Sequence, residues 1–123
     1  MAESNSKGIE YLRDYLSTVK EKGDRSEEEK VCNNLGIAYH RLGNFQEALE
    51  YFKESLSIAI EQGDRASEGR ASGHLANAHN SVGNFRLARD YHKRNLSIAK
   101  EVGDFDAEGD AYAGLGKIGR AHV

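Results

Sequence analysis

Two sets of mostly polar residues carry side chains of the types that proteins use to hold another polypeptide. The first set is Lys30, Asn33, Asn34, Ile37 and Arg41, and the second is Arg70, His74, Asn77 and Ser81. Helical spacing would place each set along one face of a helix. Asparagine is unfavourable inside a helix, so its recurrence indicates a further role, such as hydrogen bonding to a ligand. A polar face exposed to water explains any one of these residues equally well.

The basic members of these sets stand out because the chain as a whole is acidic. Lys30, Arg41 and Arg70 belong to a chain with 20 acidic and 17 basic residues and a net charge of -3. By charge complementarity, this contrast predicts a partner that is acidic or bears a carboxylate. The same balance offers no general attraction to phosphate backbones, and no basic stripe is visible, so nucleic acid is not an expected partner.

Other side chains that could do chemistry lack the spacing that chemistry requires. The five histidines form no His-Glu-x-x-His pattern, and Cys32 is the single cysteine, so neither a metal site nor an internal disulfide is expected. Cys32 falls in the apolar register and is interpreted as a small core residue, not a nucleophile. No Gly-rich phosphate loop is present. Catalytic residues, metals and cofactors are therefore not predicted, and an enzyme is not expected.

A 40-residue internal repeat supplies the elements that position these side chains. Gly-Asp pairs begin at Gly23, Gly63 and Gly103, and the segment that starts at Gly43 returns at Gly83. Self-similarity at a fixed period is typical of solenoids, in which each unit must stack on its neighbours to bury its apolar face.

Two histidines replace aromatic residues in this register. His79 takes the place of Tyr39, and His92 takes the place of Phe52. The two histidines could meet between paired helices as a proton-sensitive contact, although an ordinary hydrogen-bonded packing role explains them as well.

Each unit of the repeat reads as a pair of amphipathic helices, and the fold class as all-α. Charged residues make up 30% of the chain, no proline or tryptophan occurs, and apolar residues recur at helical spacing. The predicted helices span residues 9–22, 26–42, 45–62, 66–82 and 85–102, and a sixth begins near residue 105. The predicted core of the first complete pair is Val31, Leu35, Ala38, Leu42, Phe45, Ala48, Phe52, Leu56 and Ala59. A glycine in the left-handed conformation is expected after each helix, followed by an Asp or Asn that caps the next one.

A single domain of residues 1–123 is expected from the chain length. Its predicted parts are the second helix of an incomplete repeat at 9–22, repeats at 24–62 and 64–102, a truncated repeat at 104–117, and a non-native tail at 118–123. The tail is inferred because the final six residues break the register. Truncation there would leave an apolar edge around Tyr112 and Leu115, which predicts self-association.

The run from Asn34 to Phe52, NLGIAYHRLGNFQEALEYF, resembles a tetratricopeptide repeat in the spacing of its Leu-Gly, Tyr, Gly, Ala and Phe. The 40-residue unit length and the segments around Leu75 and Leu96 resemble the LGN/Pins group of adaptors. The resemblance implies a tetratricopeptide-type α-solenoid of about five to six helices in antiparallel pairs, wound as a right-handed superhelix. It also implies a concave groove for a partner peptide, in which Arg70 and Asn77 match the ligand contacts of that group.

The leading interpretation is a protein-interaction scaffold that binds an extended partner peptide in this concave groove. The alternative is a self-assembling structural array whose units bind neighbouring copies and take no peptide ligand. No stretch approaches the roughly 20 apolar residues that a membrane span needs, and no apolar signal core opens the sequence. A cytoplasmic adaptor without membrane contact is therefore expected.

Overall fold

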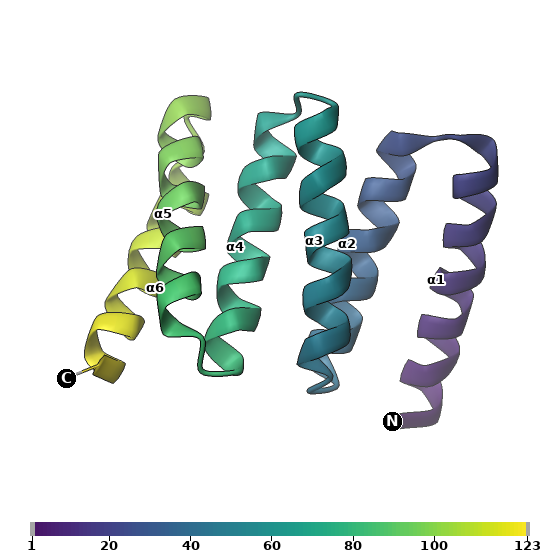
Figure 1. Cartoon of the computed structure of the whole chain (residues 1–123), viewed down its shortest axis with the longest axis horizontal. Coiled ribbons are helices and arrows are strands. Elements are labelled where there is room, and N and C mark those ends of the chain that lie inside the picture. The colour runs from purple at the N-terminus through teal and green to yellow at the C-terminus, as the bar shows by residue number, and fades with distance from the viewer. Residues whose placement is uncertain (1, 123) are drawn as a thin grey trace.

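Six helices make up the structure, a computed structural model that describes the backbone of residues 2–122 and the side chains of residues 7–117. In chain order they are α1 (Ala2–Lys22), α2 (Arg25–Arg41), α3 (Phe45–Glu61), α4 (Arg65–Ser81), α5 (Phe85–Val102) and α6 (Phe105–His122). Figure 1 shows them following one another along the long axis, with α1 at one end and α6 at the other. No helix in the described part of the chain is both long and apolar enough to cross a membrane.

The helices predicted from the repeat are confirmed, and their ends differ from the prediction by no more than one residue in α2 to α5. The first helix differs more, because α1 begins at Ala2 and not at residue 9. The non-native tail predicted at residues 118–123 falls on side chains outside the described residues.

As expected, each of the first five helices is followed by a glycine with positive φ, either directly or after one intervening residue. The φ values are 71° at Gly23, 80° at Gly43, 67° at Gly63, 83° at Gly83 and 74° at Gly103. Other residues pay a steric cost in this left-handed conformation because their Cβ crowds the backbone, so glycine is required where one helix reverses into the next.

The residues after these glycines behave in two ways. The carboxylates of Asp24, Asp64 and Asp104 accept hydrogen bonds of 3.1, 3.1 and 3.0 Å from the backbone N–H three residues later, which caps α2, α4 and α6. Asn44 and Asn84 make no such bond, so the prediction that asparagine also caps is wrong. The charged carboxylate is favoured at these positions because it also interacts with the positive end of the helix dipole.

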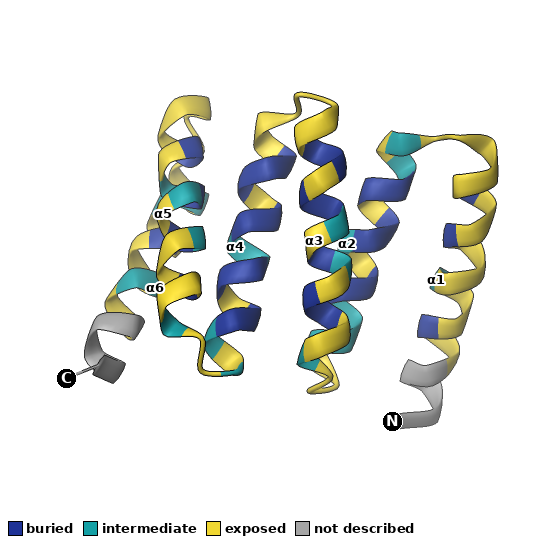
Figure 2. Cartoon of the chain, in the orientation of Figure 1, coloured by how far each residue is buried: buried dark blue, intermediate teal, exposed yellow. Residues whose placement is uncertain are grey.

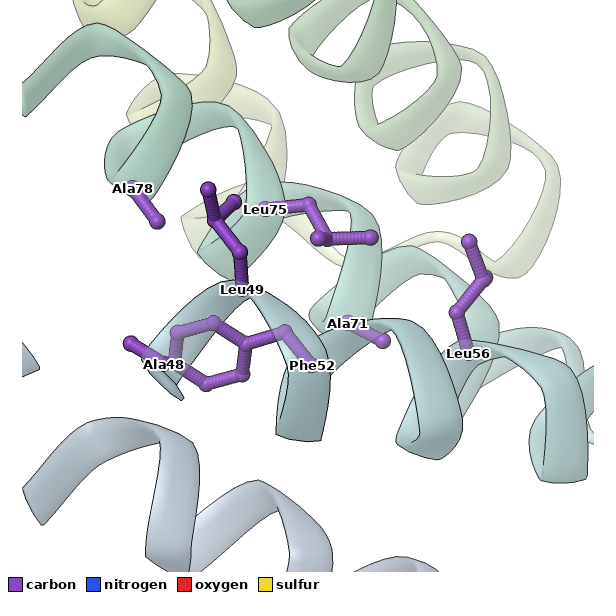
Figure 3. Packing of buried hydrophobic residues seen from close by; sticks show 7 residues of the cluster. All are labelled: Ala48, Leu49, Phe52, Leu56, Ala71, Leu75 and Ala78. Carbon is purple, nitrogen blue, oxygen red and sulfur yellow. The ribbon is translucent and has the colours of Figure 1, made fainter. Parts of the chain in front are cut away.

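Two buried clusters each join a pair of neighbouring helices. The first joins α3 to α4 and consists of Ala48, Leu49, Phe52, Leu56, Ala71, Leu75 and Ala78 (Figure 3). The second joins α1 to α2 and consists of Ile9, Leu16, Val19, Val31, Cys32 and Leu35. Figure 2 shows that buried residues follow the helix faces that meet. Burying one large side chain such as Phe52, which is 2% exposed, contributes on the order of 3 kcal/mol.

Leu42 departs from the predicted core. It is 38% exposed because it is the C-terminal cap of α2, where the chain already turns toward α3.

The contacts between helices divide them into two layers. Each helix packs on the next, and in addition α2 contacts α4 and α4 contacts α6. Within the described part of the chain, the backbones of α1, α3 and α5 do not approach one another in this way, although Lys20 of α1 reaches Glu54 of α3 in an ion pair of 3.4 Å. The helices α2, α4 and α6 therefore form an inner layer, where the array is closest packed, and α1, α3 and α5 form an outer layer. The two predicted sets of binding residues belong to α2 and α4, both in the inner layer.

Candidate functional site

The inner layer contains two hollows that bring together five of the nine predicted binding residues. The larger, called cavity A here, lies between α4, α5 and α6, has a volume of about 260 Å³ and includes Arg70, His74 and Asn77 in its lining. The smaller, called cavity B, lies between α2, α3 and α4, has a volume of about 220 Å³ and includes Ile37, Arg41, His74 and Asn77. Since His74 and Asn77 line both, the cavities are neighbours along α4.

The other four predicted residues line neither cavity. Lys30 and Asn34 are exposed on α2. Asn33 is half-buried, and its side-chain oxygen is fully buried without a hydrogen-bond partner. Ser81 is already engaged, because its hydroxyl donates to the backbone carbonyl of Asn77 at 3.1 Å and lies 3.2 Å from Nε2 of His40.

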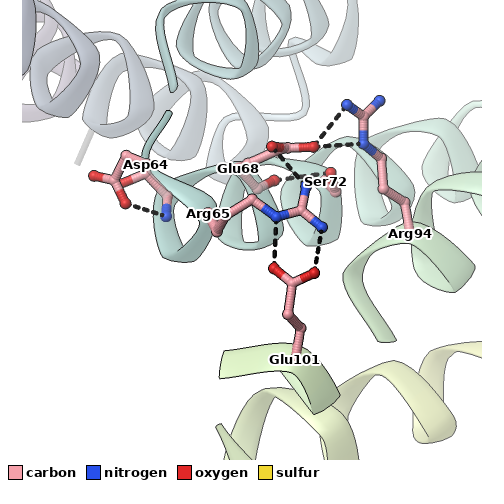
Figure 4. Close-up of polar contacts among 7 residues, drawn as sticks. Asp64, Arg65, Glu68, Ser72, Arg94 and Glu101 are labelled. Atoms are coloured by element: carbon pink, nitrogen blue, oxygen red, sulfur yellow. Dashed lines mark hydrogen bonds and ion pairs between the residues drawn. The ribbon is translucent and has the colours of Figure 1, made fainter. Parts of the chain in front are cut away.

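A network of ion pairs fixes α4, the helix shared by both cavities, against α5 (Figure 4). Arg65 donates from Nε and Nη2 to the carboxylate of Glu101 at 2.7 and 3.1 Å. Arg94 of α5 donates from Nη2 and Nε to Glu68 at 2.8 and 3.1 Å, and Arg65 reaches the same carboxylate at 3.0 Å. The Glu68 side chain is only 9% exposed, so its two arginine partners offset the cost of removing the carboxylate from water.

His74 forms the wall between the two cavities. Its ring stacks on Phe52 with centroids 5.0 Å apart and planes inclined by 10°. Burial, followed by the positive charges of Arg70 and His40, lowers the pKa of His74. The imidazole is therefore neutral near pH 7, where one ring nitrogen donates and the other accepts a hydrogen bond.

Cavity A carries charges of both signs. Arg70 is held in place because it donates from Nη2 to Oγ of Ser67 at 3.0 Å, and Ser67 donates in turn to Asp64 at 2.8 Å. Asp104 and Asp110 also line the cavity. The basic residues singled out in the sequence therefore account for only part of the charge at this cavity, because two aspartates line it as well.

Two polar side chains of α5 also line cavity A and were missed by the sequence analysis. Asn95 is 8% exposed, and His92 is 4% exposed with its Nδ1 buried and without a partner. The helical spacing of the predicted sets places residues on the first helix of each pair only, whereas these two residues come from the second. A signal was present in α4, where Gly69 and Gly73 stand in place of larger polar residues of the preceding repeat.

The structure separates the two histidines that could have met between paired helices. His79 stacks on Tyr91 with ring centroids 5.6 Å apart, as Tyr39 stacks on Tyr51 at 5.7 Å in the preceding pair. His92 instead lies against Gly114 of α6. The first histidine thus repeats an aromatic packing role, while the second belongs to cavity A.

The remaining candidates for chemistry are accounted for by packing. Cys32 is completely buried in the cluster between α1 and α2, and burial, with smaller contributions from Glu54 and Glu28, raises the pKa of its thiol to about 12. Such a thiol is a poor nucleophile because little thiolate exists near neutral pH. Among the described residues, no group of three or more His, Cys, Asp or Glu side chains could hold a metal ion.

Comparison with known proteins identifies the type of repeat. The family model described as a tetratricopeptide repeat matches residues 27–101, a stretch that contains nearly all of α2 to α5. No curated protein sequence matches the chain. The comparisons support a tetratricopeptide repeat protein and do not support the narrower resemblance to the LGN/Pins group, and they find no enzyme family.

Solved structures agree on the fold. BtubC from P. vanneervenii is 20% identical over 98% of this chain and 50% of its own, with a TM-score of 0.89. A Signal Transduction ATPase with Numerous Domains, with a tetratricopeptide repeat sensor, from Pyrococcus horikoshii is 20% identical over 90% of this chain and 17% of its own, with a TM-score of 0.84. The tetratricopeptide domain of Arabidopsis FLU is 25% identical over 80% of this chain and 88% of its own, with a TM-score of 0.64.

The chain thus spans half the length of the first of these proteins and 17% of the second. The likenesses show an all-α fold of six sequentially packed helices in a tetratricopeptide-type array.

Proposed function

Because this chain belongs to the tetratricopeptide repeat family, whose domains generally serve in protein–protein interaction, we propose that it binds an extended peptide of a partner protein along its inner layer. The observation that carries the proposal is the adjacency of cavities A and B along α4. Both cavities include His74 and Asn77, and each adds one arginine, Arg70 or Arg41. A peptide that follows the inner layer would place successive side chains in the two cavities.

Arg70 and Asn77 are the residues we expect to contribute most to binding. Both are exposed on α4, and both line cavity A. Arg70 is also preorganised by its bond to Ser67, so little side-chain entropy remains to be lost when it binds. This role rests on their positions in the cavities and does not require the LGN/Pins resemblance. Lys30, Asn33, Asn34 and Ser81 would contribute less, because none of them lines either cavity.

We further propose that the partner segment carries an acidic residue near cavity B. Arg41 is exposed there, and no acidic side chain among residues 7–117 lines that cavity. At cavity A, Asp104 and Asp110 oppose Arg70, which makes an acidic group less favourable.

A display library of random 12-residue peptides, selected on the purified chain, tests the function without a known partner. Binding of the selected peptides is then measured by calorimetry with the wild type and with Arg70→Ala/Asn77→Ala. Loss of a guanidinium and an amide from the site should weaken binding by about tenfold or more. The matched control is Arg86→Ala/Gln46→Ala, which removes the same two chemical groups from exposed positions outside both cavities.

Unchanged affinity in the Arg70→Ala/Asn77→Ala variant, or an equal loss in the control, would show that the peptides bind elsewhere. A library that yields no peptide at all would count against the function itself.

The alternative, self-assembly, is favoured by one observation at α6. Phe105 is 83% exposed and Tyr112 is 51% exposed, so the last helix presents aromatic rings to water. Sedimentation velocity over a hundredfold range of concentration tests this: a constant monomer mass rejects self-assembly, whereas a mass that rises with concentration and is restored to the monomer by Phe105→Ser/Tyr112→Ser supports it.

A further inference from the structure

The side chains between α4 and α5 that line cavity A differ from the side chains at the equivalent positions of the preceding helix pair, α2 and α3. In the first pair, the hydroxyl of Ser55 on α3 donates to Oε1 of Glu29 on α2 at 3.0 Å. Ser55 is 0% exposed and Glu29 is 7% exposed, so this hydrogen bond lies inside the protein. The first pair therefore satisfies the buried hydroxyl of Ser55 with one of its own side chains.

The second pair has the same register without that internal partner. Gly69 stands in place of Glu29, and Asn95 stands in place of Ser55. An added Cβ would lie 3.4 Å from Oδ1 of Asn95 at Gly69 and 3.0 Å from its Nδ2 at Gly73, so the carboxamide lies directly over both glycines. The space that Glu29 fills in the first pair forms part of cavity A in the second.

The polar groups in this space have no partners of their own. Asn95 is 8% exposed and makes no hydrogen bond through its side chain among the described residues. His92, which is 4% exposed, lines the same cavity, and its Nδ1 has no partner either. Buried polar groups in native proteins are nearly always hydrogen-bonded, so these two side chains leave hydrogen-bonding capacity in the cavity that a polar ligand group can use.

Charge decides which ligand group fits best. Asp110 on α6 occupies the register position that Arg70 holds on α4, and both residues line cavity A, so the cavity has a carboxylate as well as a guanidinium. Asp104, whose carboxylate caps α6 by accepting from the N–H of Ala107, also lines the cavity. The charges of these two carboxylates and of Arg70 oppose one another at the cavity, whereas Asn95 at its floor is neutral, so a neutral polar group fits beside Asn95 better than a buried charge does. A carboxamide matches Asn95, because each amide donates one hydrogen bond and accepts the other.

The length of the ligand side chain follows from the same comparison. The missing internal residue is a glutamate, which reaches from the α2 backbone to Ser55 in the first pair. A ligand group that fills the same space with a terminal amide is a glutamine side chain.

We propose that cavity A binds a glutamine side chain of the partner peptide, whose carboxamide pairs with the amide of Asn95 over Gly69 and Gly73. This inference rests on the proposed peptide-binding function and names the side chain that its central cavity selects.

The test fills the cavity with the side chains that occupy the equivalent positions of the first pair. Gly69→Glu/Asn95→Ser copies the Glu29 and Ser55 pair of the first repeat into the second. The new Cβ would lie 2.9 Å from Cγ2 of Ile98, but the first pair accommodates its glutamate beside an isoleucine, Ile58, at the same register position. The control is Gly109→Glu, which makes the same substitution at an exposed glycine of α6 with no atom within 4 Å of its Cβ.

The probes are 12-residue peptides selected from the random display library on the wild-type chain. We expect glutamine to be enriched at one peptide position, and Gly69→Glu/Asn95→Ser to weaken those peptides by about tenfold or more while Gly109→Glu leaves them unchanged. Replacing that glutamine by glutamate or methionine in the peptide should cost a similar factor. This last measurement uses only the wild-type chain and stays decisive if the double variant fails to fold.

The outcomes separate the two proposals. Peptides that bind and lose affinity in Arg70→Ala/Asn77→Ala, yet show no preference for glutamine, overturn this inference and leave the peptide-binding function standing. Peptides that prefer glutamate over glutamine at the affected position also overturn it. A library that yields no binding peptide overturns both.

Discussion

Replacing Gly36 by alanine tests how tightly the repeat register controls packing. In a helix interior this change alone would stabilise by about 1 kcal/mol, because glycine is the more flexible residue. At residue 36, however, the new Cβ would lie 2.5 Å from Cδ1 and Cε1 of Phe52 and 2.9 Å from its Cζ. The ring has little freedom to move aside, since it is 2% exposed and stacked on His74 at 5.0 Å.

Overpacking a core in this way costs about 1 to 3 kcal/mol. The cost offsets or exceeds the gain in helix propensity, so Gly36→Ala should be destabilised by about 0 to 2 kcal/mol. The matched control is Gly116→Ala, the same substitution two repeats later in α6, where no atom lies within 4 Å of an added Cβ. The control should gain up to about 1 kcal/mol. The two variants should therefore differ by about 1 to 3 kcal/mol, with Gly36→Ala the less stable.

Urea unfolding followed by far-UV circular dichroism measures this difference. With a slope of about 2 kcal/mol per molar, a difference of about 2 kcal/mol separates the two midpoints by about 1 M. A double-mutant cycle then identifies the cause, because Gly36→Ala should no longer destabilise in a Phe52→Leu background. The reasoning is refuted if Gly36→Ala is as stable as Gly116→Ala, or if its cost persists once the ring is gone.

Three further predictions concern capping, pH and thiol reactivity. Asp24→Ala should lower the free energy of unfolding by about 1 kcal/mol, and Asn44→Ala by only a few tenths, because only the aspartate side chain caps its helix; equal losses in urea melts would contradict this. The hydrogen bonds that Asp64 accepts from the start of α4 lower its pKa. For Glu68, burial raises the pKa, but the hydrogen bonds from two arginines lower it by more, so the net shift is downward. Both carboxyl groups therefore stabilise the fold above their unfolded pKa values, and the melting temperature should fall from about pH 5 downward, less steeply in Glu68→Gln; identical slopes would reject the assignment. Cys32 should react with a disulfide reagent at pH 8 only as fast as the chain unfolds, since burial raises the pKa of its thiol to about 12; a reaction at the rate of a free thiol would show that the cluster between α1 and α2 opens.

The helices and turns were predictable because each has a local cause. A glycine is needed at the positive φ that ends a helix, and the 40-residue period shows five such glycines in equivalent places. The caps were only half predictable. Asn44 and Asp24 follow glycines in the same way, yet only the aspartate caps its helix. The difference depends on side-chain charge and orientation at the turn, which spacing alone does not reveal.

The candidate binding residues were predictable only as far as one helix face determines them. Helical spacing correctly grouped Arg70, His74 and Asn77 on the accessible face of α4, where they line cavity A together. Spacing could not show that Asn95 reaches the same cavity from α5. That contact depends on the depth of packing between two helices, which the small size of Gly69 allows. The necessary comparison is between equivalent positions of successive repeats and not along one helix.

The repeat puts side chains at equivalent positions, but the neighbouring helices determine whether each polar side chain finds an ion-pair or hydrogen-bond partner within the protein. Register positions 54 and 94 illustrate this: Glu54 on α3 pairs with Lys20 of α1 at 3.4 Å, whereas Arg94 on α5 pairs with Glu68 of α4 at 2.8 Å, so equivalent positions carry opposite charges. The same logic applies to Glu29 and Gly69. The first pair fills this space with its own glutamate, whereas the second leaves an amide without a partner. Ligand selectivity should therefore reside in cavity A, even though both pairs present the same helix face.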